Sequence, residues 1–195
     1  MESSRSRGSR LTPVKIVVAG GFGVGKTTFV GAISEIEPLR SEAIITDASS
    51  GVDELFDDGT KTTTTVAMDF GRISLKHDLV LYLFGTPGQD RFHFMWNELA
   101  RGAIGAVVLV DTRRIDACFA AIDFFERRGT PFVVAINTFD GRRLHGIEEV
   151  RNALRVGRDV PVLYCDARVR VDVQRTLATL VEHALDRAVS GTPAA

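Results

Sequence analysis

The sequence predicts an α/β fold in which helices cover both faces of a mostly parallel sheet. Short apolar runs rich in valine and isoleucine alternate with segments of helical periodicity, a pattern typical of such folds. Only residues 76–78 (KHD) separate one pair of neighbouring apolar runs, which predicts a hairpin and one antiparallel edge strand. A glycine-rich stretch, residues 20–25, lies between the first strand and the first helix. We therefore expect one three-layer domain with a six-stranded sheet.

Each element is assigned from its own pattern. The expected strands are short, β-branched runs, and they cover residues 14–20, 66–75, 79–84, 104–111, 131–137 and 160–167. The expected helices show apolar residues at helical spacing, and they cover residues 26–36, 89–103, 115–129, 147–154 and 171–188. Gly129 closes the third of these helices as a C-cap. The domain is expected to span residues 14–188, between disordered tails at 1–13 and 189–195.

Composition narrows the classes of function. The formal net charge of −1 gives no global reason to expect nucleic-acid binding. No apolar run approaches the ~20 residues that span a bilayer, Glu2 excludes N-myristoylation, and the C-terminal stretch lacks a prenylation cysteine. Cys118 and Cys165 lie in apolar stretches and are expected to be buried free thiols. We expect a cytoplasmic protein without direct membrane insertion. Its basic tail is either a solvated segment or a weak tether to acidic lipid or to an acidic partner.

The glycine-rich stretch predicts a phosphate-binding loop. It matches the pattern G-x-x-x-x-G-K-[ST] in full, between a buried strand and a helix. Such a loop turns successive backbone N–H groups toward phosphate oxygens, and the helix N-terminus adds a partial positive charge. Lys26 is expected to reach the β- and γ-phosphates and the Thr27 hydroxyl to ligate Mg²⁺. The expected phosphate-binding residues are Gly20, Gly21, Phe22, Gly23, Val24, Gly25, Lys26, Thr27 and Thr28.

Two loops further along resemble the base-reading elements of Ras-like GTPases. Asn137-Thr138-Phe139-Asp140 resembles N-K-x-D, and residues 165–168 (CDAR) resemble the S-A-K element. A carboxylate at Asp140 can accept hydrogen bonds from guanine N1–H and N2–H, which adenine lacks. The resemblance implies that Asn137 ties the loops together and that the Ala167 N–H meets guanine O6. Thr138 stands where these GTPases usually have a lysine, whose aliphatic stem covers the base. Arg168, beside Asp166, could take the place of that stem.

Three long motifs make the resemblance narrower. Residues 20–30 (GGFGVGKTTFV), 61–72 (KTTTTVAMDFGR) and 84–92 (FGTPGQDRF) resemble the small GTPases of actinobacterial conservons, relatives of the gliding-motility polarity GTPase. The similarity runs from about Val14 to Ala188. It implies a GTP/GDP switch with Mg²⁺, a roadblock-type regulatory protein and a membrane sensor-kinase-like partner, which could recruit the protein to the inner face of the membrane.

The resemblance also assigns the switch residues. Thr65, with Thr64 as the alternative, is expected to meet Mg²⁺ and the γ-phosphate. The Gly88 N–H is expected to sense the γ-phosphate, and Gln89 to orient the attacking water. Gly85 stands where the family has an aspartate that supports Mg²⁺. Asp69 or Asp111 could compensate, although Asp111 could instead cap its strand.

Hydrolysis is expected to be slow. The polarity GTPase carries a catalytic arginine directly before its switch threonine, and this chain has none before Thr65. Arg91 is either a substitute or a solvated helix charge. The alternatives are a nucleotide-bound scaffold without useful hydrolysis, and an ATPase or small-molecule kinase, against which Asp140 argues.

Two segments suggest contact with partners. The long insertion before Thr65 includes residues 47–59 (DASSGVDELFDDG), with acidic side chains throughout, and is either a switch that orders on binding or a solvated insertion. The aromatic face of residues 91–99 (RFHFMWNEL) can bury only part of its side chains at helical spacing, so the rest suggests a partner surface.

Overall fold

The computed structural model describes residues 11–37, 39–46, 63–75 and 78–191. Within these ranges the side chains of residues 39–46, 63–67 and 90–91 are not part of the description. Of the tail expected at residues 1–13, residues 1–10 lie outside the described residues, whereas Thr12 and Pro13 belong to the first strand, so the domain begins slightly earlier than expected. The acidic insertion at residues 47–59 also lies outside the described residues.

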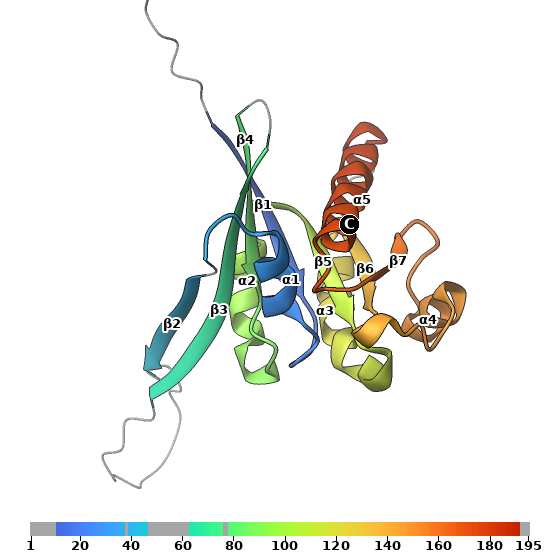
Figure 1. Ribbon diagram of the computed structural model, residues 1–195, viewed down its shortest axis with the longest axis horizontal. Coiled ribbons are helices and arrows are strands. Elements are labelled where there is room, and N and C mark those ends of the chain that lie inside the picture. Colours follow the sequence, from blue (N-terminus) through green and yellow to red (C-terminus); the bar gives the residue numbers. More distant parts are fainter. Residues whose placement is uncertain (1–10, 38, 47–62, 76–77, 192–195) are drawn as a thin grey trace, which may run out of the picture.

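Among the described residues, seven strands form one sheet in the order β2-β3-β4-β1-β5-β6-β7 (Figure 1). β1 pairs in parallel with β4 and β5, and the parallel pairing continues through β6 to β7. The strands cover Thr12–Ala19 (β1), Leu39–Thr46 (β2), Thr63–Ser74 (β3), Leu79–Gly85 (β4), Ala103–Val110 (β5), Phe132–Asn137 (β6) and Val162–Cys165 (β7). The α/β class and the mostly parallel sheet are therefore confirmed.

The antiparallel side of the sheet differs from the expectation in one respect. β2 is an additional strand, so the sheet has seven strands rather than six, and β3 lies inside the sheet rather than at its edge. β2 pairs antiparallel with β3 from Leu39↔Phe70 to Thr46↔Thr63. The mixed sequence of β2 gave no strand signal because an edge strand is held by main-chain hydrogen bonds and needs no long apolar run.

The helices follow the expected order. They are α1 (Lys26–Ile33), α2 (Trp96–Ala100), α3 (Phe119–Arg128), α4 (Ile147–Leu154) and α5 (Arg170–Val189). Short 3-10 helices precede or separate them: η1 (Asp90–Met95), η2 (Thr112–Cys118) and η3 (Phe139–Gly141). The two segments expected as single helices at 89–103 and 115–129 each begin with a 3-10 turn. Gly129 closes α3 with a left-handed φ of 63°, which confirms the expected C-cap.

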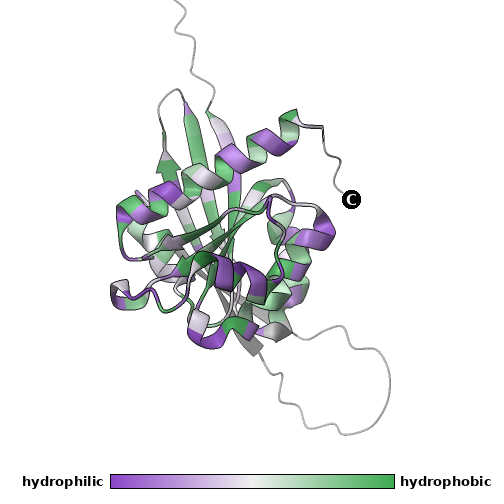
Figure 2. Ribbon diagram, turned by 90° about the vertical axis from the view of Figure 1, so that its right-hand side faces the viewer, coloured by the Kyte–Doolittle hydropathy of each residue, from purple (hydrophilic) through white to green (hydrophobic). Residues whose placement is uncertain are grey.

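Two apolar clusters lie on the two faces of the sheet. Alternate residues of β1 divide between them: Ile16 and Val18 pack with α1 and α5, while Val17 packs with α2, α3 and α4. The central strands are mostly hydrophobic, and α5 has one hydrophilic side (Figure 2). This three-layer arrangement places the carboxyl ends of β1, β6 and β7 at one edge, where the candidate site lies.

Cys118 and Cys165 are buried free thiols, as expected. Burial is the main cause that raises the pKa of Cys118 to about 12 and that of Cys165 to about 11. No helix within the described residues is long and apolar enough to cross a bilayer.

Candidate functional site

A cleft of about 460 Å³ opens where β1 ends and α1 begins. Its walls come from the phosphate loop, the start of α1, β3 and the loop that follows β4. The lining residues are Phe22, Gly23, Gly25, Lys26, Thr27, Thr28, Asp69, Thr86, Pro87 and Gly88. The cleft therefore contains much of the expected phosphate loop together with Gly88.

The phosphate loop connects Ala19 of β1 to Lys26 of α1. Gly25 caps the helix with a φ of 104°, a conformation that L side chains rarely adopt. A Cβ atom at Gly25 would also lie only 2.7 Å from Asn137 Nδ2. Glycine at this position therefore lets the chain turn sharply and lets the base-side loop approach the phosphate loop.

Lys26 lies inside the loop and is 8% exposed. Its ammonium group donates to the carbonyl oxygens of Gly20 at 2.8 Å and Gly21 at 2.7 Å. Burial lowers the pKa of Lys26 to about 8, and the nearby charge of Asp69 opposes that shift in part. An anion bound in the cleft would supply the counter-charge that this buried ammonium needs.

Thr27 and Asp69 form a hydroxyl–carboxylate pair at the base of the cleft. Thr27 Oγ1 donates to Asp69 Oδ2 at 2.6 Å, and Asp69 lies opposite Gly85 in the antiparallel β3–β4 register. A Cβ atom added at Gly85 would lie 3.0 Å from Asp69 Cβ and 3.2 Å from Oδ2. Asp69 thus places its carboxylate beside Gly85, the position at which the resemblance to Ras-like GTPases leads one to expect an aspartate.

Asp111 has a different role. Arg113 donates to both of its carboxylate oxygens, from Nε at 2.8 Å and from Nη2 at 2.8 Å, and the Arg113 backbone N–H adds a third bond at 3.0 Å. These hydrogen bonds are the main reason the pKa of Asp111 is lowered. Asp111 caps the turn after β5, which is the structural alternative that the sequence left open. Of the two carboxylates considered, only Asp69 contacts Thr27 among the described interactions.

The loop after β4 lies directly against the phosphate loop. The Thr86 N–H donates to Val18 O at 2.8 Å, and a Cβ atom at Gly88 would lie 2.7 Å from Lys26 Nζ and 2.9 Å from the Phe22 backbone. Gln89 follows at the start of η1 and is exposed. Thr65 pairs with Ile44 of β2, whereas the side chains of Thr64, Thr65 and Arg91 lie outside the described part of the structure.

Asn137 joins the base-side loops to the phosphate loop. It is 7% exposed, its Nδ2 donates to Val24 O at 2.9 Å, and its Oδ1 accepts the Ala167 N–H at 3.2 Å. The N–H expected to meet guanine O6 is therefore engaged with Asn137 in this conformation. A bound base would have to share or replace that hydrogen bond.

Arg168 connects the two carboxylates of the base side. Nη1 donates to Asp140 at 3.0 Å and Nη2 to Asp166 at 2.8 Å, and these hydrogen bonds raise the pKa of Arg168. Hydrogen bonding with Arg168 is likewise the main cause that lowers the pKa of Asp166. Thr138 is 6% exposed, and its N–H donates to Cys165 O. Arg168 thus links the loop after β6 to the loop after β7, and its expected role in place of the lysine stem stays a prediction.

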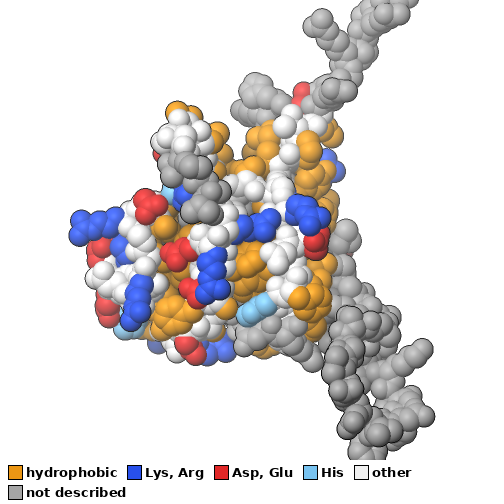
Figure 3. All heavy atoms as spheres, turned by 180° about the vertical axis from the view of Figure 1, so that it is seen from behind, with side chains coloured by type: hydrophobic (Ala, Val, Ile, Leu, Met, Phe, Trp, Pro, Cys, Tyr) orange, Lys and Arg blue, Asp and Glu red, His pale blue; other side chains and the backbone are white. Residues whose placement is uncertain are grey.

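An aromatic groove lies between α2 and α3, next to the loop after β4. His93, Trp96 and Phe124 contribute the rings, and exposed charged side chains of α3 form one rim. Phe92 and Trp96 are buried, while Phe94 is 61% exposed, so the expectation that only part of this face enters the core is confirmed. The face seen in Figure 3 exposes hydrophobic side chains between basic and acidic ones.

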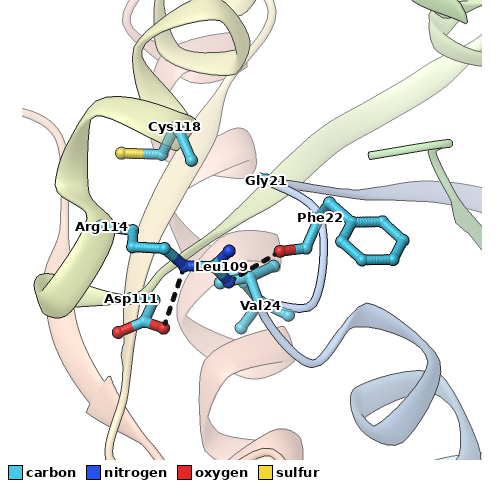
Figure 4. Close-up of a pocket in the computed structure, with 8 residues that line it drawn as sticks. Gly21, Phe22, Val24, Leu109, Asp111, Arg114 and Cys118 are labelled. Atoms are coloured by element: carbon cyan, nitrogen blue, oxygen red, sulfur yellow. Dashed lines mark hydrogen bonds and ion pairs between the residues drawn. The ribbon is translucent and has the colours of Figure 1, made fainter. Parts of the chain in front are cut away.

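Sequence reasoning missed two arginines of η2. The Arg113 guanidinium lies 4.1 Å from the ring centroid of Phe139, and Arg114 Nη2 donates to Phe22 O at 2.9 Å (Figure 4). The Asp111-Thr112-Arg113-Arg114 sequence offered one signal, namely adjacent cations at the carboxyl end of a strand in the same sheet as the phosphate loop. It did not indicate which cation faces which loop.

The fold and the cleft together define a phosphate-loop domain, and comparisons with known proteins specify the family. Residues 18–187 match the family described as "Conserved hypothetical ATP binding protein", and the chain belongs to this family. It is 30% identical over 130 residues to "Uncharacterized protein MJ1339" of Methanocaldococcus jannaschii, an alignment that covers 65% of this chain and 71% of the relative.

Solved structures of iron-transporter G domains are similar in fold. The T. maritima FeoB cytosolic domain in apo form has a TM-score of 0.61 at 16% identity, covering 89% of this chain and 64% of that one. GDP form I of the same domain gives 0.62 at 17% identity, covering 89% of this chain and 64% of that one. The Methanococcus jannaschii FeoB G-domain gives 0.59 at 13% identity, covering 90% of this chain and 100% of that one. The chain thus spans less than two thirds of the T. maritima domain, and the likeness shows a G-domain fold.

Proposed function

We propose that this protein is a GTP-binding molecular switch with slow intrinsic GTP hydrolysis. The observation that carries the proposal is that one cleft joins the phosphate loop, the Thr27–Asp69 pair and Gly88. The first of these features binds phosphates, the second suits a hard cation, and the third lies where a further phosphate group would have to enter.

The loops that follow β6 and β7 favour guanine as the bound base. Asp140 offers a carboxylate to the ring N–H and amino donors that guanine has and adenine lacks. Asn137 holds this loop against the phosphate loop, so base and phosphates would bind to one connected unit. The description of the family names ATP, and ATP binding is therefore the second candidate function.

Thr27 and Asp69 are the residues that would hold Mg²⁺ beside the phosphates. A hydroxyl and a carboxylate oxygen 2.6 Å apart fit the oxygen ligands that this ion prefers. The ion would neutralise phosphate charge. The carboxylate comes from β3 because Gly85 leaves space for it on β4.

The closeness of Gly88 to Lys26 supports a switch between two conformations. A Cβ atom at Gly88 would lie 2.7 Å from Lys26 Nζ, so residue 88 stands close to the ammonium group that is proposed to bind the phosphates. A diphosphate can bind while this loop stays in place, whereas a third phosphate requires the loop at residues 86–88 to move. The conformation described therefore suits GDP, and loop displacement is the response to GTP.

Separate residues are proposed for each role in GTP hydrolysis. Lys26 would bind the phosphates, the Gly88 N–H would hold the terminal one, and Gln89 would orient the attacking water. Thr65 is proposed as the residue of the first switch that joins them. No arginine stands directly before Thr65, so turnover is expected to depend on a regulator.

The proposed regulator is a roadblock-type protein, and a membrane sensor-kinase-like protein is the proposed upstream partner, as the conservon resemblance implies. The aromatic groove between α2 and α3 supports regulation because His93, one of its lining residues, belongs to η1, and η1 follows the loop at residues 86–88 in the chain. The proposed location is the cytoplasm, with recruitment to the membrane through partners.

Equilibrium binding of GDP, GTP and ATP, each with Mg²⁺ and with a chelator, tests the proposal. We expect Mg²⁺-dependent binding of both guanine nucleotides and no displacement of GDP by equal ATP. Displacement by equal ATP would favour the second candidate function.

Single-turnover hydrolysis separates a switch from a nucleotide-bound scaffold. The switch is expected to convert bound GTP to GDP slowly and faster with its regulator, whereas a scaffold would leave GTP intact in both cases.

A further inference from the structure

The carbonyl groups of the phosphate loop are held by side chains from three different parts of the chain. Lys26 donates hydrogen bonds to the carbonyl oxygens of Gly20 and Gly21, and Asn137 donates one to the carbonyl oxygen of Val24. Arg114 Nη2 donates a hydrogen bond to the carbonyl oxygen of Phe22 at 2.9 Å (Figure 4). The turn of the loop is thus anchored by hydrogen bonds from outside it as well as by Lys26.

Arg114 reaches the loop because of the local backbone of η2. Its φ of −144° and ψ of 60° depart from helical values, although it lies within a 3-10 segment. Asp111 Oδ2 lies 4.0 Å from Arg114 Nε, and a Cβ atom at Gly23 would lie 3.4 Å from Nη2. The guanidinium therefore lies between the carboxylate that caps η2 and the outer side of the loop (Figure 4).

The bond to Phe22 O controls the direction of a neighbouring N–H group. In a planar trans peptide the C=O of one residue and the N–H of the next point in opposite directions. The Phe22 oxygen points outward to Arg114, so the Gly23 N–H of the same peptide points to the other side, toward the cleft. The Asn137 bond to Val24 O acts in the same way on the Gly25 N–H.

We propose that Arg114 is a positioning residue for phosphate binding, which orients the Phe22–Gly23 peptide so that the Gly23 N–H faces the polyphosphate of the bound nucleotide. This inference rests on the proposed nucleotide-binding function. Arg114 is not one of the residues that line the cleft, and we infer that it acts through the backbone of the loop. Arg113, its neighbour, has a separate role because it binds Asp111 and covers Phe139.

The test compares GDP binding and GDP release in the full chain with those in Arg114→Ala and Arg114→Lys. The Ala variant is expected to bind GDP about tenfold more weakly, mainly through faster release, which is the size expected for one lost hydrogen bond from a charged donor. The Lys variant keeps a charged donor and is expected to recover most of the loss. Arg101→Ala, which removes an exposed arginine at the end of α2, is the matched control and is expected to leave GDP binding unchanged.

Guanosine, which has no phosphate, separates positioning from a general structural effect. Competition against labelled GDP should give the same guanosine affinity for Arg114→Ala and wild type within about twofold, a difference of about 0.4 kcal/mol. An equal loss for guanosine and GDP, or a Lys variant no better than Ala, would overturn the inference while leaving nucleotide binding intact. Unchanged GDP binding in Arg114→Ala would overturn it too. Absence of GDP binding in the wild type would instead overturn the proposed function and this inference with it.

Discussion

Moving the carboxylate from β3 to β4 tests the role proposed for Asp69. The double variant Asp69→Ala/Gly85→Asp transfers the charged side chain across the strand pair, since the two residues lie opposite each other in register. The single variant Asp69→Ala removes the charge without replacing it. The single variant Gly85→Asp adds a second carboxylate where a Cβ atom would lie 3.0 Å from Asp69 Cβ.

The expected magnitude follows from the contact that is lost. Thr27 Oγ1 and Asp69 Oδ2 lie 2.6 Å apart, a short hydrogen bond to a charged group. Loss of a carboxylate that holds or orients a ligand of a metal ion costs roughly 10- to 100-fold in affinity for the ion. Asp69→Ala is therefore expected to raise the Mg²⁺ concentration needed to retain GDP by that factor. The double variant should return to within about fivefold of wild type, because the carboxylate again reaches the space beside Thr27.

The assay is the release rate of fluorescently labelled GDP over a titration of free Mg²⁺. Asp123→Ala, which removes an exposed carboxylate of α3, is the control and should leave the titration unchanged. Circular dichroism melting confirms that each variant is folded before its titration is interpreted. The reasoning is refuted if Asp69→Ala retains GDP at the same Mg²⁺ concentration as wild type, or if the double variant is as impaired as the single one while remaining folded.

Three further predictions concern the same site. Burial lowers the pKa of Lys26 to about 8 in the folded protein against 10.5 for the ordinary group, so the unfolded chain binds more protons between these values. The free energy of unfolding of the nucleotide-free protein should therefore rise by roughly 3 kcal/mol from pH 8 to 10.5 relative to Lys26→Met, and urea denaturation that shows equal pH slopes would contradict this. Asp140→Asn should weaken GDP binding by about 10- to 100-fold and leave ATP competition unchanged, and calorimetry that finds equal losses for both nucleotides would argue against guanine recognition. Gln89→Leu should slow single-turnover hydrolysis by at least about tenfold with GTP affinity within twofold, whereas an unchanged rate would remove Gln89 from the mechanism.

Much of the sheet was predictable from the sequence because its central strands are buried on both faces. Runs such as residues 104–111 (IGAVVLVD) carry a strong apolar signal that does not depend on partners. β2 carries no such signal, since its place at the edge is determined by pairing with β3. The 3-10 start of the segment at 89–103 was also hidden, because apolar residues three and four apart fit both kinds of helix.

The phosphate loop was predictable because its residues are contiguous. The relation between Asp69 and Gly85 was not, because it depends on the register of two strands. A glycine in place of an expected aspartate was a usable signal, and it directed attention to two candidate carboxylates. Only the structure distinguishes them, because Asp69 accepts a hydrogen bond from Thr27 and Asp111 accepts hydrogen bonds from Arg113.

If Asp69 has the role proposed for it, its position on β3 makes the β3–β4 hairpin part of the proposed cation site. A slip of one residue in β3 would turn Asp69 to the other face of the sheet, and a slip of two would carry it about 7 Å along the strand. Only one alignment brings the carboxylate to Thr27. The end of α1 holds that alignment, because Ser34 accepts the Arg72 N–H at 3.2 Å and Glu35 accepts the Ser74 N–H at 2.9 Å. Under the role proposed for Asp69, a protein that binds this hairpin and shifts its register would release the cation without contacting the nucleotide.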